Sequence, residues 1–387
     1  MRFKDIIGQE EAKSKLLRAY KEGRVAHTQL FLGPEGSGAL PLAIAFGQYV
    51  NCTNKQDDDS CGECPSCKKF EKFSHPDLYF IFPSNKPEGF KEDPSSELYS
   101  KQWIEYLQQV NGYAVQNDWY SFLNIGNKQG NIYARDANNL IKVLGFKPYE
   151  ADYKIAIIWK AEKMDAAPSN KLLKTFEEPP DDTLIFLIAE RYELLLPTVR
   201  SRAQLVKVPK LTDDDIREFL MREADNGQLN QWDIEAVVAN AGGNLSRAKQ
   251  LLTQPDDDHA NFEKFREWLL LCYKFDYPAI FSFVQNLAGM GRERQKSFLQ
   301  YGLNVVHQSL QINSNNGQLV TGGKDEKVFL NNFAKFINQA NRDDFYKELN
   351  QAIYHIERNA HPAILFGDLS LTLAILLNRG KKAISGQ

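Results

Sequence analysis

The chain has 387 residues, of which 43% are hydrophobic and 25% are charged. These proportions are typical of folded globular chains and exclude a fibrous or largely disordered protein. Lys and Arg number 47, Asp and Glu number 50, and the net charge is -3, so no global basic field attracts nucleic acid or acidic lipid. The length predicts two or three domains.

The chain shows no signal for export or membrane insertion. No stretch approaches the roughly 18 consecutive apolar residues of a membrane-spanning helix. The opening segment, residues 1–8, has a charge every few residues where a signal peptide needs an apolar run. We therefore predict a cytoplasmic location and no membrane partner.

The first half of the chain alternates apolar strands with helices. Residues 28–32 read as a buried strand, which a glycine-rich turn over residues 33–38 joins to a helix near 40–50. Further strands are predicted at 77–82, 155–159, 184–189 and 204–208, and further helices at 10–22, 136–146 and 167–177. This alternation predicts an α/β domain over residues 1–209, with a mostly parallel sheet covered on both faces.

The rest of the chain is helical in pattern. Thr212, followed by three aspartates, is a typical helix start. It opens a small helical domain predicted over residues 210–254, with helices at 213–224, 231–240 and 245–253. A polar break over residues 254–258 leads into a larger helical domain, predicted over 255–387. Its loop signals are Asn313–Gly317 and Gly322–Gly323.

Four of the five cysteines form one cluster, with the spacing Cys52-x8-Cys61-x2-Cys64-x2-Cys67. Four thiolates at this spacing can occupy the corners of a tetrahedron around Zn²⁺, and such a site keeps no position open for water. We therefore predict a structural zinc module over residues 52–67. Disulfides are the alternative, which a reducing cytoplasm disfavours. Cys272, in an apolar run, is predicted to be a small buried hydrophobe.

Residues 84–130 fit the alternating pattern poorly. The stretch carries two prolines and a series of aromatic residues: Pro87, Pro94, Trp103, Tyr106, Tyr113, Trp119, Tyr120 and Phe122. We interpret it as a surface insertion that buries its own aromatic side chains. The alternative is a docking patch for a partner, because exposed aromatic residues often anchor interfaces.

The turn after the first strand keeps the frame of a phosphate-binding loop and lacks its chemistry. The frame glycines are Gly33, Gly36 and Gly38. A working loop continues with a lysine that reaches the β- and γ-phosphates and a hydroxyl that holds Mg²⁺. Here the two positions are Ala39 and Leu40, which supply neither the charge nor the metal ligand.

A second part of the same ATP site is also missing. In phosphate-loop ATPases the third strand ends in acidic Walker B residues that hold the metal and orient the water. Here the strand runs into Trp159 and Lys160, an indole and an ammonium. Because two independent parts are lost together, we predict that this chain binds no ATP and hydrolyses none.

Taken together, these features resemble the AAA+ clamp-loader subunits of bacterial DNA polymerase III. The segments that carry the resemblance, besides the degenerate phosphate loop and the cysteine spacing, are Ile6–Glu10, Gly23–His27, His75–Asp77, Leu172–Pro180, Leu196–Arg202, Gly243–Ala248 and Asn359–Pro362. The resemblance implies an AAA+ domain over 1–209 with a zinc module, a helical lid over 210–254, and a helical collar over 255–387. Residues 84–130 have no counterpart in it.

Clamp loaders contain ATP-hydrolysing motor subunits and a non-hydrolysing stator, and the missing lysine and carboxylates favour the stator. The resemblance then implies a hetero-oligomer within the DNA polymerase III holoenzyme, a nucleotidyltransferase complex. Its partners would be gamma/tau-like motor subunits, the delta subunit, the sliding clamp and, through the assembly, primed DNA. The alternatives are a gamma/tau-like motor subunit and, from the cysteines alone, a zinc-dependent nucleic-acid-binding module.

In such loaders an arginine of a Ser-Arg-Cys motif projects into the ATP site of the neighbouring subunit. The matching residues are Ser201 and Arg202, followed by Ala203 in place of the cysteine. A guanidinium is a planar, permanently charged donor that stabilises charge on a transferring phosphoryl group. The resemblance thus implies that Arg202 is a trans arginine finger, with Arg200 as a second candidate.

Overall fold

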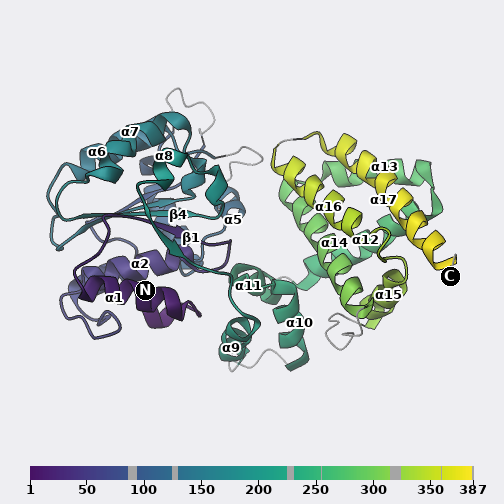
Figure 1. The fold of residues 1–387 in the computed structure, drawn as a ribbon, viewed down its shortest axis with the longest axis horizontal. Helices are drawn as coiled ribbons and strands as arrows, with labels where there is room; N and C mark the ends of the chain where they lie inside the picture. The colour runs from purple at the N-terminus through teal and green to yellow at the C-terminus, as the bar shows by residue number, and fades with distance from the viewer. Residues whose placement is uncertain are drawn as a thin grey trace. The chain divides into compact units, whose positions relative to one another are not determined.

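The computed structural model describes residues 1–85, 94–123, 130–224, 231–253, 255–313, 324–358 and 360–385. The chain divides into two compact units, shown as ribbons in Figure 1. One unit comprises Met1–Gln228 and Ala241–Ala248, and the other comprises Leu229–Asn240 and Lys249–Gln387. The predicted division into three domains, with boundaries after residues 209 and 254, stays a prediction.

A five-stranded parallel sheet forms the centre of the first unit. In spatial order its strands are β2 Leu78–Ile81, β3 Lys154–Trp159, β4 Thr183–Ala189, β1 Thr28–Leu32 and β5 Gln204–Lys207. Every neighbouring pair is parallel. The predicted α/β class and the five predicted strands are confirmed. Strands β1, β3 and β4 are mostly apolar and buried, as a sheet covered on both faces requires, whereas the edge strand β5 is largely exposed.

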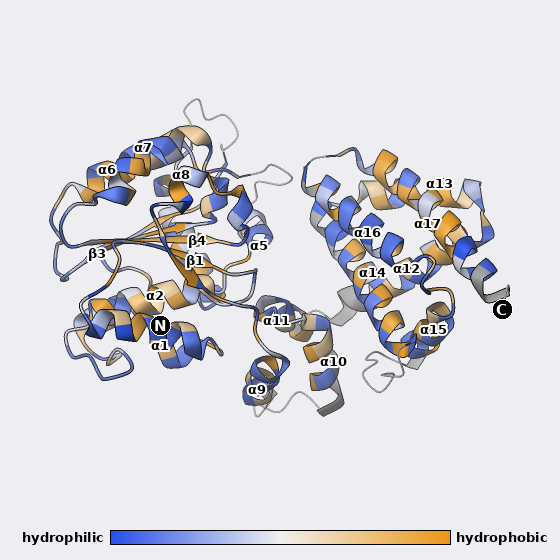
Figure 2. Cartoon of the chain, viewed as in Figure 1, coloured by the Kyte–Doolittle hydropathy of each residue, from blue (hydrophilic) through white to orange (hydrophobic). Residues whose placement is uncertain are grey.

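Helices cover both faces of this sheet. The covering helices are α1 Glu10–Lys21 and α2 Ala39–Val50 on one face, and α6 Ala134–Leu144 and α7 Ala166–Glu177 on the other. Successive strand residues alternate between the faces, so Phe31 and Ile157 pack toward α1 and α2, whereas Leu30 and Ile158 pack toward α6 and α7. Figure 2 shows the apolar strands between the apolar sides of these helices.

The aromatic side chains of the inserted stretch pack against residues at the ends of strands β2 and β3. Its described elements are η2 Ser96–Tyr99, α4 Ser100–Gln109 and α5 Gln116–Phe122. Trp103 and Trp119 are both 0% exposed, and the Trp103 ring lies 4.4 Å from Phe82 and 4.9 Å from Trp159, between centroids. The predicted self-burial is confirmed for the described residues; Pro87 lies outside them.

Several shorter elements complete the described part of the first unit. They are η1 Phe3–Asp5, α3 Pro65–Glu71, η3 Ala161–Lys163, η4 Tyr192–Leu194, α8 Pro197–Arg200 and α9 Asp213–Ala224. The predicted start of α9 is confirmed. Thr212 caps it, since its Oγ1 accepts a hydrogen bond from the Asp215 backbone N–H at 3.1 Å and the Asp215 carboxylate accepts one from the Thr212 N–H at 2.9 Å.

The second unit is helical in its described residues. Its helices are α12 Pro255–Lys274, α13 Tyr277–Gly289, α14 Arg292–Asn313, α15 Lys324–Ala334, α16 Arg342–Glu357 and α17 Pro362–Ser385, whereas α10 Gln231–Ala241 and α11 Leu245–Thr253 are divided between the units. Trp268 is fully buried, and its indole N–H donates to Ser370 Oγ at 2.8 Å. Cys272 is 0% exposed, as predicted.

The polar break predicted over residues 254–258 is wrong for Pro255–Asp258. Helix α12 begins at Pro255, because proline suits the first helical position. Gln254 lies outside the described residues. So do Ser314–Gly323 of the predicted loop and Asn359 of the C-terminal motif.

Helix α17 is the most apolar long segment in the described part of the chain. Pro362–Lys382 is long and apolar enough, by length and composition, to cross a membrane. However, α17 packs against α12, α13 and α16, and its residues Phe366 and Leu373 are 0% exposed. These contacts are those of a core helix, whose apolar residues are interrupted by polar ones such as Asp368 and Ser370.

Candidate functional site

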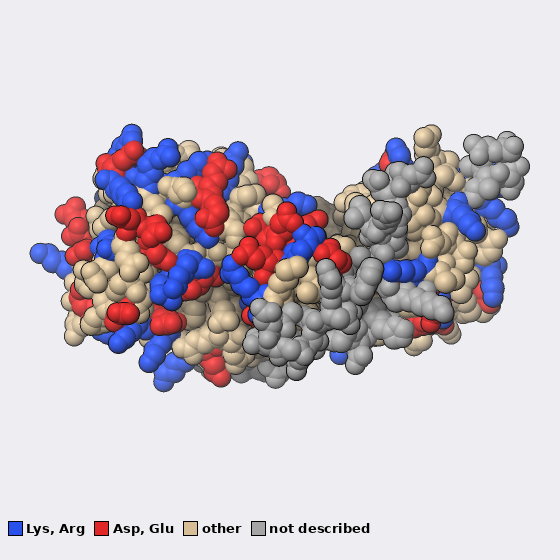
Figure 3. Space-filling model, turned by 90° about the horizontal axis from the view of Figure 1, so that it is seen from below, with Lys and Arg blue, Asp and Glu red and all other residues tan. Residues whose placement is uncertain are grey.

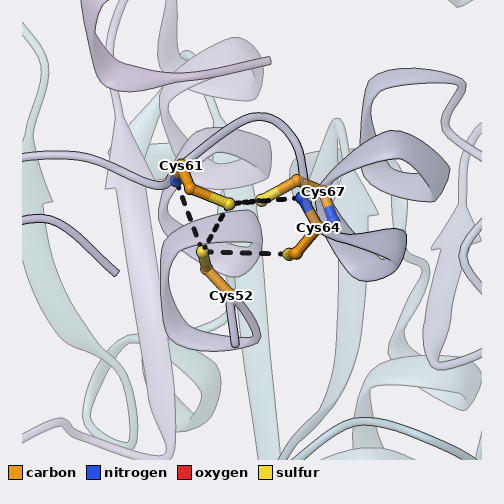
Figure 4. Close-up of side chains that lie close together, drawn as sticks. All are labelled: Cys52, Cys61, Cys64 and Cys67. Atoms are coloured by element: carbon orange, nitrogen blue, oxygen red, sulfur yellow. Dashed lines mark hydrogen bonds between the residues drawn. The ribbon is translucent and has the colours of Figure 1, made fainter. Parts of the chain in front are cut away.

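The four clustered cysteines converge on one point (Figure 4). Their sulfur atoms all lie within 4.8 Å of one another. Cys52 Sγ is 3.5 Å from Cys61 Sγ and 4.0 Å from Cys64 Sγ, and Cys61 Sγ is 3.9 Å from Cys67 Sγ. Two sulfurs on a tetrahedral Zn²⁺ lie about 3.8 Å apart, given a Zn–S bond of about 2.3 Å. All four thiols are free, and the cluster fits a metal ion.

The backbone around the cluster is arranged to stabilise thiolates. The N–H groups of Cys61, Cys64 and Cys67 donate to the sulfurs of Cys52, Cys61 and Cys64, at 3.3, 3.3 and 3.4 Å. Burial raises the pKa of the Cys64 thiol, but hydrogen bonds from Thr53 and Cys67 lower it more, to about 6. Burial raises the pKa of Cys52, so a metal that binds there releases a proton.

The loop between Cys52 and Cys61 also ties the start of the chain to the sheet domain. Asp59 accepts hydrogen bonds from the backbone N–H groups of Phe3 and Lys4, at 2.9 and 3.1 Å. Gln48, on α2, accepts one from the Met1 amino group at 2.8 Å and donates another to Ser60 Oγ at 2.9 Å. A metal ion bound by all four cysteines would cross-link these segments and would leave no coordination position open for catalysis.

The degenerate phosphate loop lies where β1 passes into α2. Gly38 has a φ of 91° and immediately precedes the helix, which starts with Ala39 and Leu40. Both side chains are buried, at 7% and 3% exposure. The cavity left at this loop measures about 30 Å³, whereas sites for drug-sized ligands and cofactors measure about 300–1,000 Å³.

Side chains from two distant segments fill the space around the loop. The Tyr113 hydroxyl, from the insertion, accepts a hydrogen bond from the Ile7 N–H at 3.2 Å, and a Cβ added to Gly38 would lie 3.4 Å from the Tyr113 ring. Asn244 covers Gly36 so closely that an added Cβ would lie 1.8 Å from its Oδ1. Neither contact could be predicted from the local sequence, because each joins residues far apart in the chain.

Strand β3 ends at Trp159, and the residue that follows it is the positively charged Lys160. Lys160 is 4% exposed, has a φ of 56°, and pairs with Glu190 at the end of β4. The nearest downstream carboxylate, Glu162, accepts a hydrogen bond from the Glu190 N–H at 3.2 Å. Burial raises the pKa of Glu162, an effect that attraction to Lys160 opposes and the charge of Glu190 reinforces. The Lys160 ammonium would repel a Mg²⁺ ion.

Arg202 lies in the turn between α8 and β5. Its Nε donates to Glu177 Oε2 at 2.8 Å and its Nη1 donates to the Thr198 carbonyl at 3.1 Å. Ser201 Oγ donates to the same carbonyl at 3.2 Å. The second candidate, Arg200, lies instead over the ring of Tyr192, 4.8 Å from its centroid.

Arg202 and the phosphate loop lie at opposite ends of strand β1. Strands β1 and β5 are parallel, with Gln29 opposite Gln204, so Arg202 lies near the start of β1 and Gly33 follows its end. The five residues of β1 span about 16 Å, at about 3.3 Å per residue. This is longer than an arginine side chain, so Arg202 cannot serve the loop of its own chain.

Comparison with known proteins places the chain in a family. The model of the family described as DNA polymerase III, delta subunit, matches residues 8–212. The delta' subunit of Bacillus subtilis DNA polymerase III is 23% identical over 367 residues, which cover 94% of each chain. The tau subunit of the same organism is 25% identical over 272 residues, which cover 70% of this chain and 40% of the tau chain.

Among solved structures, a gamma subunit-related protein of DNA polymerase III from Thermotoga maritima has a TM-score of 0.43 and 15% identity, over 95% of this chain and 99% of that one. The family model covers more than half of this chain, and the delta' match runs over nearly all of it. The chain therefore belongs to the DNA polymerase III, delta subunit family, and it is a clamp-loader subunit.

Proposed function

We propose that the chain is the non-hydrolysing stator of the clamp loader, a delta'-like subunit that supports the ATP-driven loading of the sliding clamp onto primed DNA. The observation that carries this proposal is the filled phosphate loop. Ala39 and Leu40 stand at the lysine and hydroxyl positions, Tyr113 and Asn244 cover the glycines, and a cavity of about 30 Å³ is left for a nucleotide.

In this proposal the chain acts on ATP only in a neighbouring subunit. Arg202, with Ser201 beside it, is the trans arginine finger of a gamma/tau-like motor subunit. Arg202 lies at the opposite end of strand β1 from the phosphate loop of the same chain, and this position supports a role between subunits. Arginine fingers supply roughly 10³–10⁵ in rate in other phosphoryl-transfer proteins, so a subunit without its own turnover controls that of its neighbour.

The proposed architecture follows the same assignment. An AAA+ domain over residues 1–209, a lid over 210–254 and a collar over 255–387 would join the motor and delta subunits in a cytoplasmic hetero-oligomer. The cysteine cluster would hold one structural Zn²⁺ through Cys52, Cys61, Cys64 and Cys67, and the ion would stabilise the fold without taking part in ATP chemistry.

Contact with DNA would be made through the assembly rather than by this chain alone. The net charge of -3 gives no overall attraction to phosphate. On the face seen in Figure 3, basic and acidic side chains are interspersed and form no broad basic field over the described residues. This distribution suits a subunit whose partners are mostly proteins.

Two measurements on purified protein test the proposal. The full chain should co-purify with a motor subunit and a delta subunit, and alone it should neither bind nor hydrolyse ATP. The likeness to the tau subunit, at 25% identity, favours the competing assignment as a motor. ATP turnover by the isolated chain at a rate typical of a motor subunit would establish that assignment and reject the stator.

The zinc-dependent nucleic-acid-binding module makes a different prediction. If the cysteines formed such a module, chelation of the metal would abolish salt-dependent DNA binding by the full chain. In our proposal, chelation lowers the stability of the first unit and neither creates nor removes a DNA site. A DNA-binding titration with and without chelator separates the two.

A further inference from the structure

The guanidinium of Arg202 is held at two points by its own chain. Its Nε donates to the carboxylate of Glu177 at 2.8 Å, and its Nη1 donates to the carbonyl of Thr198 at 3.1 Å. Two bonds from different nitrogens fix both the position and the plane of the rigid guanidinium. Glu177 lies within the segment Leu172–Pro180 and is the last residue of α7.

Both anchors belong to rigid parts of the fold. Glu177 is the last residue of α7, directly after Phe176, which is 2% exposed. The Phe176 carbonyl accepts a hydrogen bond from Thr28 Oγ1 at 2.9 Å, which ties this helix end to β1. Thr198 lies within α8, beside Val199, which is 1% exposed. The two groups that hold Arg202 therefore have fixed backbones.

The rest of the guanidinium remains available. A guanidinium carries five N–H donors, and the two bonds leave the Nη2 group without a partner in the described part of the chain. The Arg202 side chain is 30% exposed and that of Glu177 is 57% exposed. An ion pair this open contributes little to stability, so its role is better sought in the orientation of the arginine.

We propose that Glu177 is a positioning residue that holds Arg202 in the orientation in which its free N–H groups meet the phosphates of a neighbouring subunit. The inference rests on the proposed function of Arg202 as a trans arginine finger. Without Glu177, the long side chain of Arg202 would become ordered only when ATP binds at the junction with the neighbouring subunit. A donor that is not preorganised stabilises a transition state less well.

The test uses the full chain in a complex reconstituted with the motor and delta subunits, the sliding clamp and primed DNA. ATP turnover is measured for the wild type and for the variants Glu177→Ala, Glu177→Gln and Arg202→Ala. Glu178→Ala is the matched control, because Glu178 is the adjacent exposed carboxylate. Thermal unfolding and co-purification of each variant confirm that it folds and assembles.

We expect Glu177→Ala to lower kcat about tenfold with the KM for ATP little changed, because misplacement of a catalytic group by about 1 Å costs up to about a hundredfold. Glu177→Gln should retain part of the rate, since its carbonyl still accepts the hydrogen bond from Nε. Glu178→Ala should match the wild type. The double variant of Glu177→Ala with Arg202→Ala should be no slower than Arg202→Ala alone.

The outcomes separate this inference from the proposed function. If Arg202→Ala lowers turnover and Glu177→Ala does not, the positioning role is wrong while the finger stands. If Arg202→Ala leaves turnover unchanged, the finger is wrong and the positioning role falls with it. A double variant that is clearly slower than Arg202→Ala would place Glu177 in another role and would also overturn the inference.

Discussion

The hydroxyl of Tyr113 accepts a hydrogen bond from the backbone N–H of Ile7 at 3.2 Å, across 106 positions of sequence. This contact joins the inserted stretch to the opening segment of the chain, beside Gly38 of the phosphate loop. The phosphate loop thus lacks its lysine and its hydroxyl, and residues of its own chain also fill the space around it. The missing side chains and the filled space are two different obstacles to nucleotide binding, and they can be tested separately.

Restoring the missing loop chemistry alone should not restore nucleotide binding. The double variant of Ala39→Lys with Leu40→Thr supplies the charge and the hydroxyl of a working loop. The substitutions do not remove Tyr113 or Asn244, which leave a cavity of only about 30 Å³ at the wild-type loop, and the ammonium of Lys160 still opposes Mg²⁺. Isothermal titration with Mg²⁺–ATP should show no binding. Binding at micromolar ATP by a folded double variant would contradict the filled site.

Removal of the metal should destabilise the first unit. Metal analysis of the purified chain should find one zinc ion, and Cys52→Ser should lose it together with several kcal/mol of stability, of the order expected when a structural zinc centre is lost. Cys272→Ala is the control, because Cys272 is buried in the second unit far along the chain and should leave the zinc content unchanged. Full stability after chelation would argue against a structural ion.

His75 should make the fold sensitive to acid. Burial lowers its pKa from 6.5, against the attraction of Glu150 and Asp77 and together with the repulsion of Lys69. Its Nδ1 accepts a hydrogen bond from the Asp77 N–H at 3.0 Å, which fixes the neutral form. As the pH falls below 6.5, His75 is therefore protonated in the unfolded chain before it is protonated in the folded chain. The free energy of unfolding decreases as the pH falls below that value.

Urea unfolding between pH 5 and pH 7 measures this effect. The wild type should lose up to about 1.4 kcal/mol per pH unit from this group within the window. His75→Asn, whose Oδ1 can accept from the same N–H, should show a shallower dependence. Exposed His361→Asn is the control and should follow the wild type. Equal slopes for the wild type and His75→Asn would remove His75 as the cause.

The sheet and the cysteine cluster were predictable from the sequence because their signals are local. Most of the strands are short, largely apolar runs between turn residues, and the tight spacing of the clustered cysteines is itself a geometric constraint. The start of α12 was predictable in principle. Pro255 with three aspartates after it was interpreted as a break, although proline and acidic residues favour a helix start equally well.

What the sequence did not reveal depends on contacts across the fold. Trp103 and Tyr106 have helical spacing, but their helix in the insertion is defined by packing against Trp159 and its neighbours. The pairing of Lys160 with Glu190, and of Arg202 with Glu177, joins residues 30 and 25 positions apart. Nothing in the local sequence around Lys160 or around Arg202 indicates the partner of that residue.

The most direct test of the account is the ATP turnover of the reconstituted clamp loader with wild-type chain or with Arg202→Ala. Arg202 is 30% exposed on its side chain, so its loss should leave folding and assembly intact. We predict that clamp- and DNA-stimulated turnover falls by about 10³ or more at the site that this subunit adjoins, while the isolated chain remains without turnover. Unchanged turnover in the complex, or ATP hydrolysis by the isolated chain, would contradict the account.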